Sequence, residues 1–124
     1  MKILFALSCV LAISACTTNP DIGSLSSTQR ANLASLEVYK GVLPQNRPYE
    51  VVGEAKGLSC FRNAYQVGQH LTEEEAMQGV KLNAAKLGAD AVINTFCQRN
   101  SGTDWANNCW ASFVCAGDAI RYTH

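Results

Sequence analysis

The sequence predicts a small α+β domain, in which an antiparallel or mixed sheet of about four strands packs on one main helix and is cross-linked by two disulfides. Three observations predict this class: an amphipathic segment with capping residues at both ends, β-branched or alternating segments around it, and four cysteines in the part expected to fold. With 124 residues, the chain has room for one such domain.

Residues 1 to 15 read as a signal peptide. Lys2 precedes an uncharged apolar run that ends at Ile13, and this run is shorter than the roughly 20 residues of a membrane span. Ile13-Ser14-Ala15-Cys16 resembles the bacterial lipobox, which predicts cleavage before Cys16 and lipidation of its thiol. The alternative is an ordinary secretory signal that is cleaved nearby.

Thr17 follows the lipid-bearing cysteine. In the Gram-negative sorting pattern that this resembles, a residue other than Asp at this position implies export to the outer membrane. We therefore expect a protein that is held to the outer membrane by its lipid anchor, with its domain in the periplasm.

Residues 16 to 36 are predicted to be a lipidated, flexible tether. Thr17 to Leu36 is rich in small polar residues and contains one proline, which is typical of a linker. A helix over Thr28 to Glu37 is the alternative, because two leucines recur there at helical spacing behind a Ser/Thr cluster. The disulfide-bonded domain is expected over residues 37 to 124.

The first strand is expected over Tyr49 to Ala55, where apolar or small residues alternate with acidic ones, and Gly57 is expected to end it. The main helix is expected over Glu73 to Leu87. Thr72 and Glu75 form a capping-box pattern at its start, and Gly88 stands where a left-handed C-cap belongs. Its apolar stripe consists of Ala76, Val80, Ala84 and Leu87.

Three further strands are expected after the helix. Asp90 to Cys97 is apolar and β-branched, and Trp110 to Cys115 and Ala119 to Tyr122 are the remaining candidates. The polar segment Asn100 to Asn108 is expected to be an exposed loop between antiparallel strands.

Four cysteines remain after the signal peptide and the lipidated residue are set aside. An exported domain meets an oxidising compartment, so an even number predicts two disulfides, and the residues alone leave all three pairings open. A four-thiolate zinc site is the alternative, but such sites draw ligands from close pairs, whereas 36, 11 and 5 residues separate these cysteines. The four are Cys60, Cys97, Cys109 and Cys115.

Charge and composition exclude several functions. The chain has ten basic and ten acidic residues and no basic patch with interleaved aromatics, so we expect no nucleic-acid partner. The two histidines, His70 and His124, have no nucleophile or second ligand at a known spacing. We therefore expect no enzymatic activity, no catalytic residue, no cofactor and no metal.

Trp105 and Trp110 flank Cys109, and one of them is a candidate exposed anchor for a protein partner.

The order LEVY, VVGEAKGLSC, VKLNAAKLGADAVINTFC and SGTDWANNCWASFVCAGDAI is similar to the RcsF family of outer-membrane lipoproteins, over about Val38 to Tyr122. The resemblance implies interleaved disulfides, Cys60 to Cys109 and Cys97 to Cys115. It also implies a sensor of envelope stress that signals to the Rcs phosphorelay through protein contacts. The implied partners are outer-membrane β-barrel proteins, their assembly machinery and the inner-membrane regulator IgaA.

Two other functions remain as alternatives. One is a structural or ligand-binding envelope lipoprotein without a link to a phosphorelay. The other is an envelope hydrolase or thiol enzyme, for which the sequence offers no nucleophile and base. The helix and the following Leu87 to Ile93 also look like small α+β domains of the YbjQ type.

Overall fold

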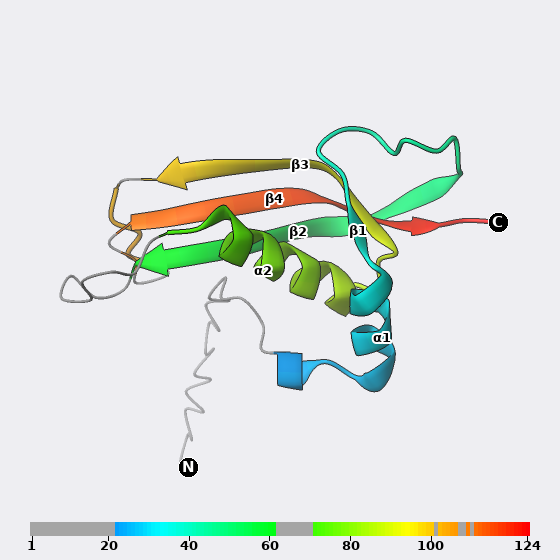
Figure 1. The fold of residues 1–124 in the computed structure, drawn as a ribbon, viewed down its shortest axis with the longest axis horizontal. Helices are drawn as coiled ribbons and strands as arrows, with labels where there is room; N and C mark the ends of the chain where they lie inside the picture. The colour runs from blue at the N-terminus through cyan, green and yellow to red at the C-terminus, as the bar shows by residue number, and fades with distance from the viewer. Residues whose placement is uncertain (1–21, 62–70, 101, 107–108, 110) are drawn as a thin grey trace, which may run out of the picture.

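The computed structural model describes residues 22–61, 71–100, 102–106, 109 and 111–124. The predicted signal peptide and Cys16 lie outside the described residues. The chain order is a short 3-10 helix, two α-helices and four strands, so the predicted α+β class is confirmed (Figure 1). The elements are η1 (Ile22–Ser24), α1 (Ser27–Ser35), β1 (Glu37–Val38), β2 (Tyr49–Phe61), α2 (Glu73–Lys86), β3 (Ala91–Asn100) and β4 (Ala111–Tyr122).

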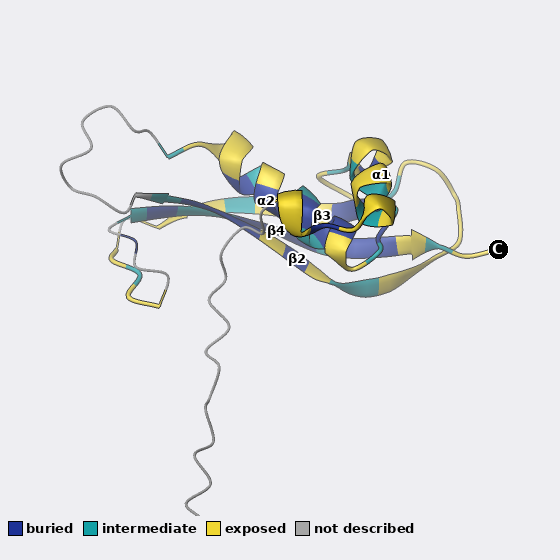
Figure 2. Cartoon of the chain, turned by 90° about the horizontal axis from the view of Figure 1, so that it is seen from below, coloured by how far each residue is buried: buried dark blue, intermediate teal, exposed yellow. Residues whose placement is uncertain are grey.

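The four strands form one mixed sheet in the order β1-β3-β4-β2. The short β1 pairs in parallel with β3, and β4 pairs antiparallel with both β3 and β2. Both helices lie over the same face of this sheet (Figure 2). The core between α2 and the sheet contains Val80 and Ala84 of α2, Ala55 of β2, and Val92 and Ala119 of the central strands.

Helix α2 begins at Glu73 as predicted and ends at Lys86, one residue before the predicted Leu87, but its N-terminal cap is built differently. The Thr72 hydroxyl accepts a hydrogen bond from the Glu75 amide at 3.2 Å. The Glu75 carboxylate does not complete the predicted box directly, because the Ser59 hydroxyl of β2 stands between the two groups. Ser59 accepts from the Thr72 amide at 3.1 Å and donates to Glu75 Oε2 at 2.9 Å. At the other end, Gly88 has a φ of 72°, as a left-handed C-cap requires.

Strand β2 does not end at Gly57, contrary to the sequence prediction. The strand continues to Phe61, and Gly57 lies directly beneath α2. A Cβ at this position would come within 1.7 Å of the Ala76 carbonyl oxygen. The glycine is therefore required by the close approach of strand and helix.

The C-terminal strand is also longer than predicted. The two expected strands join into the single strand β4, which pairs with β2 along its whole length and with β3 from Ser112 to Ile120. The small residues Ala116 and Gly117 that separate the two expected strands lie buried in the middle of the sheet. The predicted loop between Asn100 and Asn108 follows β3, which extends three residues beyond Cys97.

The prediction of a flexible tether is wrong for residues 22 to 36. Helix α1 lies there, over Ser27–Ser35, close to the alternative prediction of a helix over Thr28 to Glu37. Ser26 and Gln29 form a reciprocal capping box at the start of α1. Leu25 is 2% exposed and packs with Leu33 against α2, and Leu36 belongs to the main core. The polar composition indicated a linker because, in this segment, only Leu25 and Leu36 are buried. The folded part of the chain thus begins before residue 37.

Candidate interaction surface

The two disulfides join the cysteines in the interleaved pattern. Cys60 is bonded to Cys109 and Cys97 to Cys115. The bonds close loops of 49 and 18 residues, and no thiolate of the four is left for the alternative zinc site. Among the residues that the structure describes, no group of three or more His, Cys, Asp or Glu side chains is placed to hold a metal ion.

The disulfides lie on opposite faces of the sheet. Cys97 and Cys115 face each other across β3 and β4 and belong to the core beneath the helices. Ser59 points toward α2, because it bonds to Glu75, so the next residue, Cys60, points to the other face. The Cys97–Cys115 bond therefore fixes the two central strands, β3 and β4, within the core. The Cys60–Cys109 bond holds the segment after β3 against the end of β2.

That segment forms a tight turn around Trp105. The backbone amides and carbonyls of Asp104 and Cys109 exchange hydrogen bonds at 2.7 and 2.9 Å, and the Asp104 carboxylate accepts from the Ala106 amide at 3.0 Å. The side chain of Trp105 is 82% exposed. Because the Cys60–Cys109 bond fixes the base of the turn, the indole is presented to solvent from an anchored loop.

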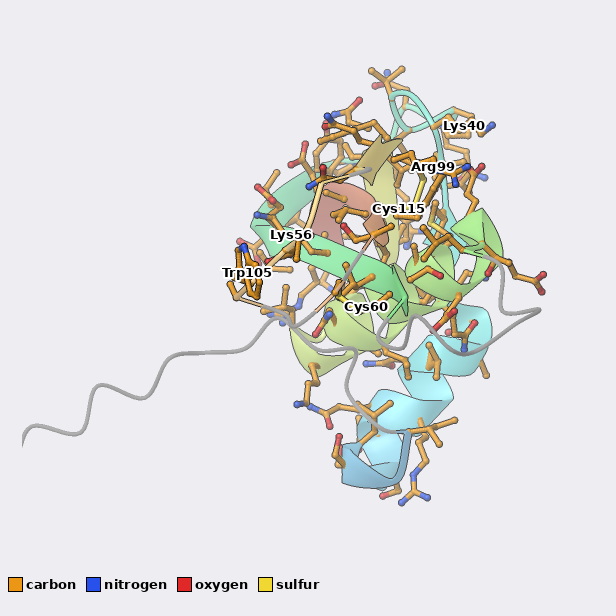
Figure 3. All side chains as sticks on the ribbon, turned by 90° about the vertical axis from the view of Figure 1, so that its left-hand side faces the viewer. Lys40, Lys56, Cys60, Arg99, Trp105 and Cys115 are labelled. Carbon is orange, nitrogen blue, oxygen red and sulfur yellow. A yellow bond between two sulfur atoms is a disulfide. The ribbon has the colours of Figure 1, made fainter. Side chains whose placement is uncertain are left out.

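Strand register places a second aromatic residue on the face away from the helices. Phe96 and Lys56 are both register partners of Ala116, one on each side of β4. Their side chains share the face opposite Cys115, since neighbouring residues of a strand alternate. Phe96 is 63% exposed. Figure 3, which looks along the strands, shows Trp105 and Lys56 on this same side of the sheet.

We call the exposed side chains of Phe96, Lys56 and Trp105 the open face. Its charge is balanced locally, because Lys56 Nζ lies 3.1 Å from Glu54 Oε1. The opposite end of the same sheet face is covered by the segment between β1 and β2. Tyr39 and Leu43 of that segment, together with Tyr122 of β4, pack on Ala91, Ile93 and Ile120.

The sequence did not indicate that Phe96 lies at the surface, because the strand predicted over Asp90 to Cys97 looked uniformly apolar. The register between β3 and β4 shifts between Ile93 and Phe96. Asn94 lies in this irregularity with a φ of 52°, and asparagine tolerates that conformation better than most residues. Ile93 remains buried while Phe96 is exposed. An asparagine in the middle of a β-branched run was the available signal.

Trp105 is exposed, as predicted for one of the two tryptophans. Trp110 and His70 lie outside the described residues. His124 is exposed at the end of the chain. Within the described ranges, no helix is both long and apolar enough to cross a membrane.

A partner can bind to the open face by covering its two exposed aromatic side chains. Aromatic residues on a fixed scaffold contribute strongly to protein interfaces because little side-chain entropy is lost when they are buried. Lys56 and Glu54 can supply polar contacts at the edge of such an interface. The buried Cys109 and Cys115 hold the scaffold together and are not themselves presented to a partner.

No family model matches the sequence, and no curated protein matches it significantly. A crystal structure of a protein of unknown function from the DUF74 family of Pediococcus pentosaceus is similar, with a TM-score of 0.48 and 19% identity. The similarity covers 69% of this chain and 96% of that one.

Proposed function

We propose that this chain is an outer-membrane lipoprotein that senses envelope stress and signals to the Rcs phosphorelay through protein–protein contacts, like the RcsF family that it resembles. The interleaved disulfide pairing is the observation that carries the proposal. Both bonds are those that the resemblance implied, and they join a sheet of the expected class. The lipobox at Ile13 to Cys16 supplies the anchor.

Partners are recognised in this proposal through the open face. Phe96 and Trp105 are both exposed. Strand register places Phe96 on the side of the sheet that carries no helix, and Figure 3 shows Trp105 on the same side. By resemblance, the partners are outer-membrane β-barrel proteins, their assembly machinery and the inner-membrane regulator IgaA. No reaction takes place in the domain, because its role is to present a surface.

A genetic experiment tests the proposal. We expect deletion of the gene to abolish induction of a phosphorelay reporter by envelope damage. Wild-type protein restores the induction, whereas Cys16→Ala, which has no thiol to carry the lipid, does not. An unchanged reporter response in the deletion strain contradicts the signalling function. It leaves the structural or ligand-binding lipoprotein as the better account, and recovery of only cell-wall material after cross-linking would support that alternative.

A further inference from the structure

The segment Ile22 to Ser35, which contains η1 and α1, lies between the lipidation site and the sheet. We call it the docked segment. It packs on α2 through a small cluster of its own, in which Leu25 and Leu33 meet Leu82 and Ala85. This cluster is separate from the main core between α2 and the sheet. The docked segment is thus an addition to the outside of α2 (Figure 1).

The contact between α1 and α2 is slight. None of the nine residues of α1 is buried, and Leu25 is the one buried residue before them in the described chain. One side-chain hydrogen bond joins α1 to α2, from Gln29 Nε2 to the Lys86 carbonyl at 3.3 Å, and it is exposed to water. Such a segment can open locally while the rest of the domain stays folded.

The main domain does not depend on the docked segment. Helix α2 packs on the sheet through Ala76, Val80 and Ala84, which face away from the small cluster. Leu36 belongs to the main core and continues into β1. Once released, α1 would not stay helical, because isolated helices shorter than about 12 residues are marginal in water.

We propose that the docked segment is a releasable part of the tether, and that its docking sets how far the domain reaches from the membrane. This inference rests on lipidation of Cys16, as in the proposed function. While the segment is docked, six residue steps join Cys16 to Ile22, which span at most about 20 Å. After its release, twenty steps join Cys16 to Leu36, which span at most about 70 Å. The docked form holds the domain beside the membrane, and the released form lets it meet distant partners.

Cleavage by an arginine-specific protease tests the release. Arg30 lies in the middle of α1, where the helix protects its peptide bond, and Arg47 precedes a proline and resists cleavage. The full lipidated protein would be bound to vesicles of phosphatidylethanolamine and phosphatidylglycerol. We would then measure the rate at which a fragment that begins at Ala31 leaves the vesicles.

The chain offers a matched pair of variants. Leu25→Ser removes the buried anchor of the docked segment, whereas Ile22→Ser changes a residue that is 52% exposed. We expect Leu25→Ser to speed cleavage after Arg30 about tenfold or more, and Ile22→Ser to leave the rate as in wild type. Ser26→Ala, which removes the capping box of α1, should give a smaller increase and serves if Leu25→Ser does not accumulate.

The distance between the domain and the membrane is measured separately, by fluorescence energy transfer. The donor is attached to the cysteine of the Thr103→Cys variant, and the acceptors are in the lipid headgroups. The transfer should fall in Leu25→Ser and stay unchanged in Ile22→Ser. Equal cleavage rates, or equal transfer, in the two variants overturn the proposal. Failure of the wild-type protein to bind vesicles would instead overturn the lipid anchor, so the two failures are distinguishable.

Discussion

The hydroxyl of Ser59 on β2 donates a hydrogen bond to the carboxylate of Glu75 on α2. The same oxygen accepts from the Thr72 amide, so one side chain joins the strand to the start of the helix. We expect Ser59→Ala to lower the free energy of unfolding by about 1 to 3 kcal/mol, because it leaves two polar groups without this partner. Urea unfolding followed by circular dichroism measures the loss.

Ser112 provides the opposite case at equal burial. Ser112 is 0% exposed and Ser59 is 1% exposed, yet the Ser112 hydroxyl has no hydrogen-bond partner in the described structure. Removing a buried hydroxyl that bonds to nothing relieves an uncompensated loss of hydration. Ser112→Ala should therefore leave the unfolding free energy unchanged or raise it by about 1 kcal/mol. A loss as large as that of Ser59→Ala would show that the Ser112 hydroxyl is paired.

Gly57 should be among the least replaceable residues of the domain. In Gly57→Ala the new methyl group would meet the backbone of α2, with the Ala76 oxygen at 1.7 Å and the Val80 nitrogen at 2.4 Å. Because backbone atoms cannot rotate away as a side chain can, the helix and the strand must separate. We expect the free energy of unfolding to fall by about 3 kcal/mol or more. Gly41→Ala is the control, since nothing lies within 4 Å of its added carbon. Thermal melting compares the two, and equal melting temperatures would contradict the packing described for Gly57.

The sequence signals that predict α2 are local. The start and end of α2 were predictable because Thr72 and Gly88 mark them within the helix's own neighbourhood. The role of Gly57 was not, because a glycine that ends a strand and one that lies beneath a helix look alike until the helix is placed. The cap at Ser59 also depends on a contact between residues 16 positions apart.

The candidate surface was predictable only in part. Trp105 stood out because two tryptophans flank a cysteine in a polar segment. Phe96 did not, because its exposure depends on the register shift beside Asn94. The helix α1 was ambiguous for an energetic reason: its sequence buries so little apolar surface that its composition is that of a linker.

The two disulfides should contribute differently to the domain. The chain-entropy estimate for loops of 49 and 18 residues is about 4 kcal/mol for Cys60–Cys109 and about 3 kcal/mol for Cys97–Cys115. We expect the paired variant Cys60→Ser/Cys109→Ser to free the turn that carries Trp105 while the β3–β4 ladder persists. Hydrogen exchange at the Asp104 and Cys109 amides should then accelerate far more than exchange at the Val92 amide in the core.

The paired variant Cys97→Ser/Cys115→Ser is the matched control. It removes a bond within the core beneath the helices, so exchange should accelerate across β3 and β4 together. The same pattern of protection in both paired variants would contradict the assignment of the two bonds to opposite faces.

The open face should matter for partner binding and not for stability. Phe96 and Trp105 are 63% and 82% exposed, so Phe96→Ala and Trp105→Ala should change the unfolding free energy by no more than about 0.5 kcal/mol. Each should weaken partner capture about tenfold or more if these rings are the anchors of the interface. Val42→Ala, at a side chain that is 76% exposed and outside the open face, is the control. Cross-linking in cells followed by quantification of the captured partner measures the effect, and capture that falls equally in all three variants would remove the open face as the binding surface.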